Sequence, residues 1–337
     1  MLLTVRSAVF TALLFAAISF VFPRYFNGPY PHPPGPIFDK EANRFYLHEI
    51  ERVQPEVILL GDSILTKDVD LAGFQDQTGL HTYKLDLPGS SSALWYLILA
   101  YDIVPAQPAP RTVVLLFRDT ILTAPTFRTT GPYFGLIDKY APPRNTLLIE
   151  RAFLSTLTPP QLVLERYFPL YTYRGEVRES IDSGLRYGVP AALDCDRECV
   201  DPLVTHLLND IPEESKSEAI VQAEQPLYSD QELDFYAQVE RSFLPEMIRL
   251  AQQDGIQLVL VRAPTRVFRS QEAEPAGLDT YLAGLRAYLA QHGIAYLDLA
   301  WPEAIGLDNF TDPHHMDTEG KALFTKIFVA ELAPYLK

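Results

Sequence analysis

Residues 56–63 read EVILLGDS, and this stretch decides the fold. Its apolar part is short and rich in β-branched side chains, which predicts a buried strand over residues 56–60. Four similar runs predict further strands, at residues 81–87, 112–117, 256–261 and 294–299. Segments with apolar residues at helical spacing predict helices, at residues 69–77, 91–103, 231–254, 278–293 and 318–336. Strands that alternate with helices indicate an α/β fold, with a five-stranded parallel sheet between two helical layers.

The alternation is interrupted after the third strand. Residues 120–227 are punctuated by proline and biased toward helix, with no strong strand signal. We therefore expect one α/β domain over residues 54–337 that carries a large, mostly helical insertion at about 120–227. The insertion would serve as a lid, a platform for substrate or a docking surface. Its two cysteines, Cys195 and Cys199, would either form a small loop disulfide outside the cytoplasm or stay reduced.

The chain begins with an apolar segment. The run from residue 2 to residue 22 is interrupted by a single charged residue, Arg6. As a helix it is long enough for the ~30 Å core of a membrane, so residues 1–26 are predicted to be a transmembrane anchor. The short head favours an amino terminus in the cytoplasm and a body in the periplasm or on the extracellular side. A cleaved signal peptide is the alternative. Residues 27–53, which begin with a proline-rich stretch, are interpreted as a spacer and lead-in.

Composition excludes several classes of protein. The 337 residues carry 43 acidic and 28 basic side chains, a formal net charge of −15, whereas nucleic-acid binding needs clustered lysine and arginine. The chain is 21% charged and 47% hydrophobic, which excludes global disorder. Its 2 cysteines cannot build a disulfide scaffold or a four-cysteine zinc site. We expect no cofactor, no metal and no nucleic-acid partner.

Chemically useful side chains follow the predicted strands. In an open parallel sheet, ligands bind beyond the carboxyl ends of the strands. Residues 61–63 (Gly-Asp-Ser) follow the first strand, and residues 88–92 (Pro-Gly-Ser-Ser-Ser) follow the second. Residues 118–120 (Arg-Asp-Thr) follow the third, Arg262 follows the fourth, and residues 312–315 (Asp-Pro-His-His) come after the fifth. One rim of the sheet therefore collects nucleophile candidates, a glycine turn, arginines and an Asp/His pair.

Three of these blocks resemble those of the SGNH (GDSL-type) hydrolase and acyl-esterase superfamily. Residues 61–63 are similar to its first block, residues 88–90 to its second, and residues 312–315 to its D-x-x-H block. The likeness covers most of residues 54–117 and 228–337, and it implies a flavodoxin-like three-layer fold. With its apolar amino terminus and the stretch LPGSSSALWY at residues 87–96, the chain looks most like exported, membrane-anchored members associated with O-acylation of cell-envelope polymers.

The resemblance also implies roles for particular residues. Ser63 would be the nucleophile, His315 the base that removes its proton, and Asp312 the acid that orients the histidine. The backbone N–H groups of Ser63 and Gly89 would form the oxyanion hole. His314 is interpreted as a neighbour of the base, because the Asp/His cluster is a weak ligand set for a metal.

One block departs from the pattern of the superfamily. The third block there contributes an asparagine side chain to the oxyanion hole, whereas this chain has Arg118, Asp119 and Thr120 at that place. Arg118 would either supply a charged donor instead or pair with Asp119 and take no part in catalysis. The candidates for substrate binding are Asp62, Arg118, Asp119 and Arg262. For Arg262, a salt bridge is the alternative.

Three functions stay open at this point. The first is a membrane-anchored, exported serine esterase or O-acyltransferase that forms an acyl-Ser63 intermediate and acts on an acylated envelope glycan or similar carbohydrate. Its partners would be that carbohydrate or acyl-ester substrate, the membrane contacted by residues 2–22, and a membrane-bound O-acyltransferase or other membrane complex. The second is a catalytically weak or inactive SGNH-like subunit with a structural or docking role. The third is an exported esterase for small or lipid esters.

Overall fold

The computed structural model describes residues 2–25, 30–172, 174 and 221–336. The chain divides into two units. One comprises Met1–Ile37 and Phe153–Lys216, and the other comprises Phe38–Ala152 and Ser217–Lys337. Each unit is described by itself, and every candidate site residue belongs to the second.

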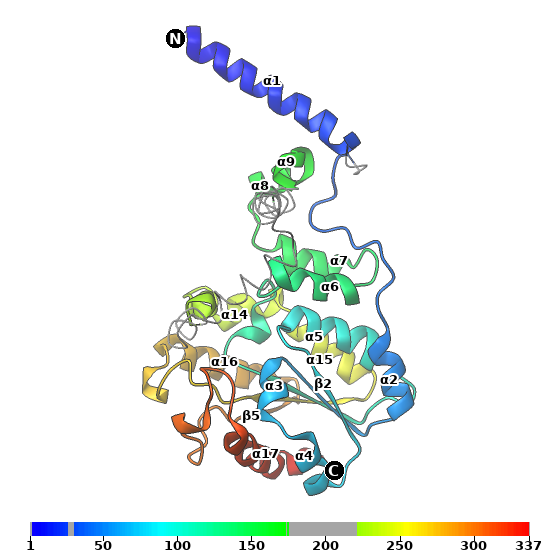
Figure 1. Ribbon diagram of the computed structural model, residues 1–337, viewed down its shortest axis with the longest axis vertical. Coiled ribbons are helices and arrows are strands. Elements are labelled where there is room, and N and C mark those ends of the chain that lie inside the picture. The colour runs from blue at the N-terminus through cyan, green and yellow to red at the C-terminus, as the bar shows by residue number, and fades with distance from the viewer. Residues whose placement is uncertain (1, 26–29, 173, 175–220, 337) are drawn as a thin grey trace, which may run out of the picture. The chain divides into compact units, whose positions relative to one another are not determined.

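A five-stranded parallel sheet forms the centre of the second unit (Figure 1). Its strands are β1 (Val57–Gly61), β2 (Thr82–Asp86), β3 (Thr112–Phe117), β4 (Gln257–Arg262) and β5 (Ala295–Asp298). They lie in the order β2-β1-β3-β4-β5. From β1 the chain goes to the edge strand β2, returns to β3 on the other side of β1, and continues to the opposite edge at β5. The direction reverses at β1 and β3, which is where doubly wound sheets bind ligands. The five predicted strands are confirmed.

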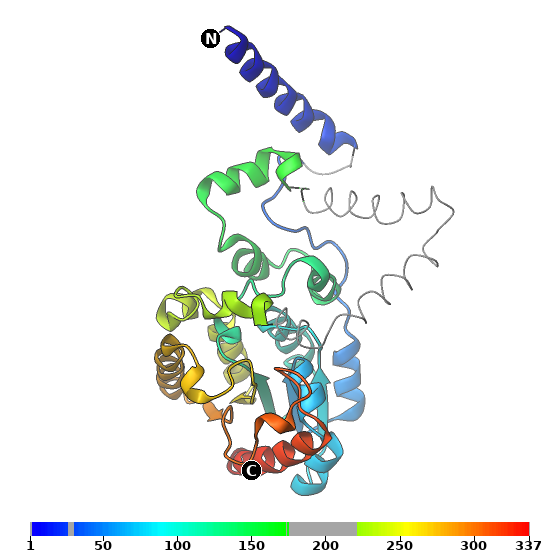
Figure 2. The ribbon, with the colours of Figure 1, turned by 60° about the vertical axis from the view of Figure 1, so that its left-hand side comes forward.

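Helices cover both faces of the sheet (Figures 1 and 2). One face packs against α3 (Ser63–Asp68), α4 (Leu71–Thr78) and α17 (Thr318–Leu332), with Leu59 and Val114 in the shared core. The other face carries α5 (Ser92–Ile98), α15 (Leu244–Gln253) and α16 (Ala276–Gln291). Every residue of β1 and β3 is buried, as expected for central parallel strands covered on both sides.

The helix predicted over residues 231–254 is wrong as a single element. Its first part, α14 (Phe235–Gln238), passes into a 3₁₀ turn at Val239–Arg241, and α15 begins only at Leu244. Pro245 stands in the first turn of α15. A proline is tolerated there but breaks a helix interior, because it has no N–H and its ring crowds the preceding turn.

Other helix boundaries differ less. The predicted helix over residues 91–103 is α5 followed by a π-helical turn at Leu99–Ile103. The closing helix ends at Leu332 and continues as a 3₁₀ turn with Pro334 inside it. Two short helices had not been predicted, α2 (Phe45–Val53) before β1 and the six-residue α3 after it.

The described part of the predicted insertion contains helical elements and no strand. They are 3₁₀ turns at Ile121–Thr123, Gly131–Tyr133 and Gln225–Tyr228, a π turn at Glu150–Leu154, and α6 (Phe134–Tyr140), α7 (Thr146–Ile149), α8 (Pro159–Tyr167) and α9 (Pro169–Thr172). The boundary between the two units falls inside the insertion, after Ala152. Cys195 and Cys199 lie outside the described residues, so their pairing stays a prediction.

The first unit contains α1 (Leu2–Tyr25) together with α8 and α9. The backbone N–H of His32 donates to the carbonyl of Arg166 at 3.0 Å. Among the residues that the structure describes, no helix combines the length and the apolar character needed to cross a membrane. The anchor predicted over residues 1–26 and the localisation derived from it stay predictions.

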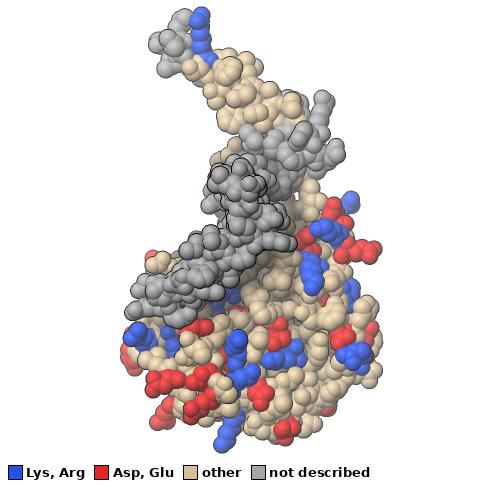
Figure 3. All heavy atoms as spheres, in the orientation of Figure 1, with Lys and Arg blue, Asp and Glu red and all other residues tan. Residues whose placement is uncertain are grey.

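Acidic and basic side chains are interspersed over the face of the molecule shown in Figure 3. On the described part of that face, no broad patch of lysine and arginine stands out. A patch of lysine and arginine is the kind of surface that binds the phosphate backbone of a nucleic acid.

Candidate active site

The candidate nucleophile sits at a tight junction between a strand and a helix. Strand β1 ends at Gly61, and Ser63 is the first residue of α3. Between them, Asp62 caps the helix, because its Oδ1 accepts a hydrogen bond from the N–H of Ile64 at 2.9 Å. A Cβ on Gly61 would lie 2.9 Å from the Cβ of Leu65, so only glycine lets the chain turn this closely. The turn presents Ser63 at the carboxyl end of β1.

The Asp/His block lies on a loop that its own hydrogen bonds hold in place. Oδ1 of Asp312 accepts from the N–H of His314 at 2.8 Å and from the N–H of His315 at 3.0 Å. The next residue, Met316, donates its N–H to the fully buried Asp68 at 2.9 Å. The loop is therefore tied to α3, the helix that carries the serine.

Three side chains form a continuous hydrogen-bonded chain. Nε2 of His315 lies 2.9 Å from Oγ of Ser63, and Nδ1 lies 2.7 Å from Oδ2 of Asp312. If Nδ1 carries the proton toward Asp312, Nε2 is free to accept the serine proton, a tautomer assigned from the network. Burial would raise the pKa of Asp312, but the hydrogen bonds from His315 and the loop backbone outweigh it and lower the pKa. Asp312 is therefore an ionised partner for the imidazole.

The turn that contains Gly89 lies beside the end of β1. Gly89 has φ of +80°, and a Cβ there would lie 3.0 Å from the ring of Tyr133, so the turn needs glycine. Oγ of Ser90 donates to the carbonyl of Gly61 at 3.4 Å, which links this turn to the end of β1. Within the described part of the chain, the N–H groups of Ser63 and Gly89 donate to no protein acceptor. Both therefore have no acceptor within the described protein, and their predicted role in an oxyanion hole stays a prediction.

Arg118 is paired with Glu224 in the protein interior. It is buried, with an exposed fraction of 2%, and its guanidinium makes a bidentate ion pair with Glu224, in which Nη1 lies 2.6 Å from Oε2. Nε lies 4.0 Å from a carboxylate oxygen of Asp62. Burial would lower the pKa of Arg118, but the charges of Glu224 and Asp62 raise it instead. Arg118 thus pairs with Glu224 rather than with Asp119, and it lies beside Asp62 of the nucleophile turn.

Asp119 and Arg262 are bonded to each other. Nη2 of Arg262 lies 2.9 Å from Oδ1 of Asp119, whose other oxygen accepts from the hydroxyl of Tyr228 at 2.6 Å. Arg262 also pairs with Glu274. Asp119 and Arg262 are each 3% exposed. The structure therefore shows Arg262 in a salt bridge, the alternative considered for it. Asp62, too, is buried and bonded within the protein, and direct substrate binding by these candidates stays a prediction.

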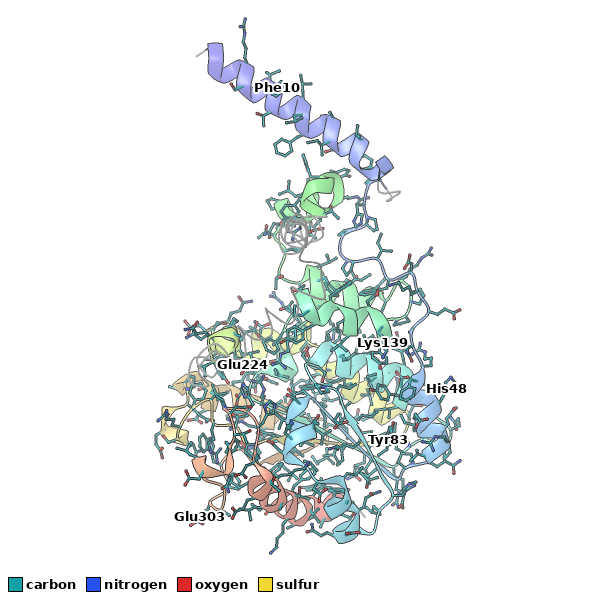
Figure 4. The ribbon with its side chains drawn as sticks, viewed as in Figure 1. Phe10, His48, Tyr83, Lys139, Glu224 and Glu303 are labelled. Carbon is teal, nitrogen blue, oxygen red and sulfur yellow. The ribbon has the colours of Figure 1, made fainter. Side chains whose placement is uncertain are left out.

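Sequence reasoning missed a buried charge cluster beside the nucleophile turn, made of Asp62, Arg118, Arg128, Glu224 and His314. Arg128 lies 3.7 Å from Asp62 and 3.4 Å from Glu224, and the Nε2 of His314 lies 2.9 Å from Glu224, although not at a hydrogen-bonding angle. Figure 4 marks Glu224. Burial would raise the pKa of Glu224, but the interactions with Arg118 and His314 together outweigh it and lower the pKa to about 2. Arg128 and Glu224 lie within the predicted insertion, outside every recognisable block, so no local signal identified them.

Within the described residues, no group of three or more His, Cys, Asp or Glu side chains is arranged to hold a metal ion. The chemistry that the site supports is that of the serine and its hydrogen-bonded histidine.

No protein-family model matches the sequence, and no curated protein matches it. Among solved structures, a candidate acylhydrolase from Bacteroides fragilis is 12% identical, with a TM-score of 0.38 over 88% of this chain and 92% of that one. A candidate lipolytic protein of the G-D-S-L family from Desulfitobacterium hafniense is 9% identical, with a TM-score of 0.37 over 81% and 97%. A GDSL-like lipase from Bacteroides thetaiotaomicron is 11% identical, with a TM-score of 0.35 over 83% and 86%. Likenesses at these scores assign no function.

Proposed function

We propose that the chain is a serine esterase or O-acyltransferase of the SGNH type that works through an acyl-Ser63 intermediate. The observation that carries this proposal is the hydrogen-bonded chain from Ser63 through His315 to Asp312. Its donor and acceptor atoms are those that nucleophilic acyl transfer requires. A serine, a histidine and a carboxylate brought together from both ends of the domain also fit that role better than a purely structural contact would.

The proposed reaction proceeds in two halves. Oγ of Ser63 adds to the acyl carbonyl carbon while its proton moves to Nε2 of His315, and Asp312 stabilises the imidazolium. The electron pair displaced onto the carbonyl oxygen is held by the N–H groups of Ser63 and Gly89. The intermediate collapses, the alcohol leaves with the proton from His315, and the acyl group stays on Ser63. Water or a sugar hydroxyl then takes the acyl group by the reverse sequence.

The proposed substrate is an acylated envelope glycan or a similar carbohydrate, and the proposed place is the exported face of a membrane. The support for both is the sequence resemblance and the apolar segment at residues 2–22. Extraction of cell membranes with alkaline carbonate tests the anchor, because an integral protein stays in the pellet and a peripheral or secreted one does not.

Steady-state turnover of 4-nitrophenyl acetate by the full-length protein tests the chemistry. We expect Ser63→Ala and His315→Ala to lower kcat by at least about 100-fold, the size of a general-base contribution. His292→Ala serves as the matched control, because this histidine bonds the carbonyl of Tyr288 at the far end of α16. Wild-type turnover that survives in both site variants would rule the proposal out.

A second candidate is a catalytically weak SGNH-like subunit with a docking role. One observation favours it: Arg118 stands where the resembling superfamily has its asparagine donor, yet it is buried and bonded to Glu224. Absence of turnover by a folded wild-type protein would favour this candidate.

A further inference from the structure

The oxyanion hole described so far has two backbone donors and lacks a side-chain donor. Arg118 cannot serve, since both terminal nitrogens of its guanidinium are bonded to Glu224 in the protein interior. A developing negative charge on an acyl oxygen is best stabilised by fixed donors or charges aimed at it. A third donor to the oxyanion hole would have to come from another side chain.

Arg128 contacts both flanks of the candidate oxyanion hole. On one side, its Nη1 lies 3.7 Å from Oδ2 of Asp62, the residue next to Ser63. On the other side, its guanidinium carbon lies 5.3 Å from the ring centre of Tyr133, and that ring packs directly on Gly89. Arg128 thus contacts Asp62, the chain neighbour of Ser63, and Tyr133, whose ring lies against Gly89.

Arg128 also differs from Arg118 in having donor capacity left. Its side chain is 17% exposed, whereas that of Arg118 is 2% exposed. Its contacts with Asp62 and Glu224, at 3.7 Å and 3.4 Å, are long for charged hydrogen bonds. Two arginines against two carboxylates balance the buried charge, so the cluster holds the guanidinium in place without exhausting its five N–H groups.

The backbone at Arg128 is strained. Its φ is +55°, a left-handed conformation that a residue with a Cβ rarely adopts and that glycine adopts freely. Strain of this kind persists only where the surrounding structure holds the conformation in place, and it clusters at functional sites.

We propose that the guanidinium of Arg128 is the third donor of the oxyanion hole, in place of the asparagine that the chain lacks. This inference rests on the proposed function. When Oγ of Ser63 adds to the carbonyl carbon, the carbonyl electron pair moves onto oxygen and the serine proton goes to His315. Arg128 donates a hydrogen bond to that oxygen and transfers no proton, so the charge is stabilised until the alcohol leaves.

Arg128→Gly is the decisive variant, because glycine relieves the backbone strain while removing the guanidinium. We expect kcat for 4-nitrophenyl acetate to fall by about 100-fold or more with KM little changed, as for loss of one oxyanion donor. Free guanidinium at a sub-denaturing concentration should restore part of the lost kcat. Arg144→Gly is the matched control, since Arg144 is exposed and has a similar φ of +57°.

The outcomes separate the two proposals. If wild-type protein turns over the ester and Arg128→Gly matches its kcat, Arg128 is no oxyanion donor and the proposed function stands. If the wild type shows no turnover, both fail. Should Arg128→Gly not fold, Arg128→Lys replaces it, because it keeps the charge and loses the fork of donors. A lowered kcat at unchanged KM then supports the inference, and a wild-type kcat overturns it.

Discussion

Asp312 and Asp68 hold the base from two sides. Asp312 accepts from the His315 ring and from two N–H groups of its own loop. Asp68 accepts from the N–H of Met316, the residue that follows His315. The ring of the base is therefore oriented by one carboxylate, and its backbone is fixed by another, which is how a loop residue attains the precision that proton transfer needs.

The buried carboxyl of Asp68 makes the free energy of unfolding depend on pH. Burial raises the pKa of its carboxyl well above the usual range, so the unfolded chain releases this proton at a lower pH than the folded protein does. The contribution of Asp68 to stability is therefore fully present below its unfolded pKa and is lost as pH rises through its folded pKa. Between pH 4 and pH 7, we expect the wild type to lose more free energy of unfolding than Asp68→Asn does. The difference should be about 1 kcal/mol or more.

Urea unfolding at the two pH values measures this difference. Asp76→Asn, which changes an exposed carboxylate on α4, controls for the loss of charge. Equal pH dependence in Asp68→Asn and wild type would contradict the expectation.

At the scale of elements, the junction of β1 and α3 determines where the serine stands. Leu65 of α3 packs closely on Gly61. A methyl group added at Gly61 would also lie 3.3 Å from the carbonyl oxygen of Leu116 on β3. Strand, turn and helix are therefore one rigid support. A change that opens the junction moves Ser63 relative to His315.

We expect Gly61→Ala to lower the free energy of unfolding by about 1–3 kcal/mol, as overpacking does, and to lower kcat as well. Gly135→Ala is the matched control: it lies in α6 with open space around its Cβ position, so alanine should leave stability unchanged or raise it by up to about 1 kcal/mol. Chemical denaturation of the two variants compares them. A Gly61→Ala protein as stable and as active as Gly135→Ala would contradict the rigid-support interpretation.

The elements differ in how well the sequence predicts them. Strands β1 and β3 were predictable because short runs of β-branched and aliphatic residues fit a sheet buried on both faces. The break before α15 depended on Pro245, a local signal that the apolar periodicity hid. Helix α3 has only six residues, too few to show a period.

At the scale of the whole molecule, the ion pair of Arg118 and Glu224 joins positions 106 apart in the chain. It connects the end of β3 to the far end of the predicted insertion. No spacing rule in the sequence links two such residues. The triad was predictable because its blocks have recognisable patterns, whereas the charge cluster became visible only in three dimensions.

This pair should contribute to stability far more than an exposed one. We expect Glu224→Gln to lower the free energy of unfolding by about 3–5 kcal/mol, because it leaves the buried Arg118 without its charge partner. Adding Arg118→Met should recover part of that loss, since the uncompensated charge is removed. Glu246→Gln, which breaks the exposed pair with Arg249, should cost only about 0.2–1 kcal/mol. Thermal or urea unfolding decides, and similar losses at the two sites would contradict a buried, paired Glu224.

The most direct test of the central claim is intact-mass analysis of the full-length protein after exposure to a fluorophosphonate, which reacts with activated serines. The account expects one adduct per folded chain, present in His292→Ala and lost in both Ser63→Ala and His315→Ala. An unmodified wild-type protein, or an adduct that persists in Ser63→Ala, would contradict an activated Ser63.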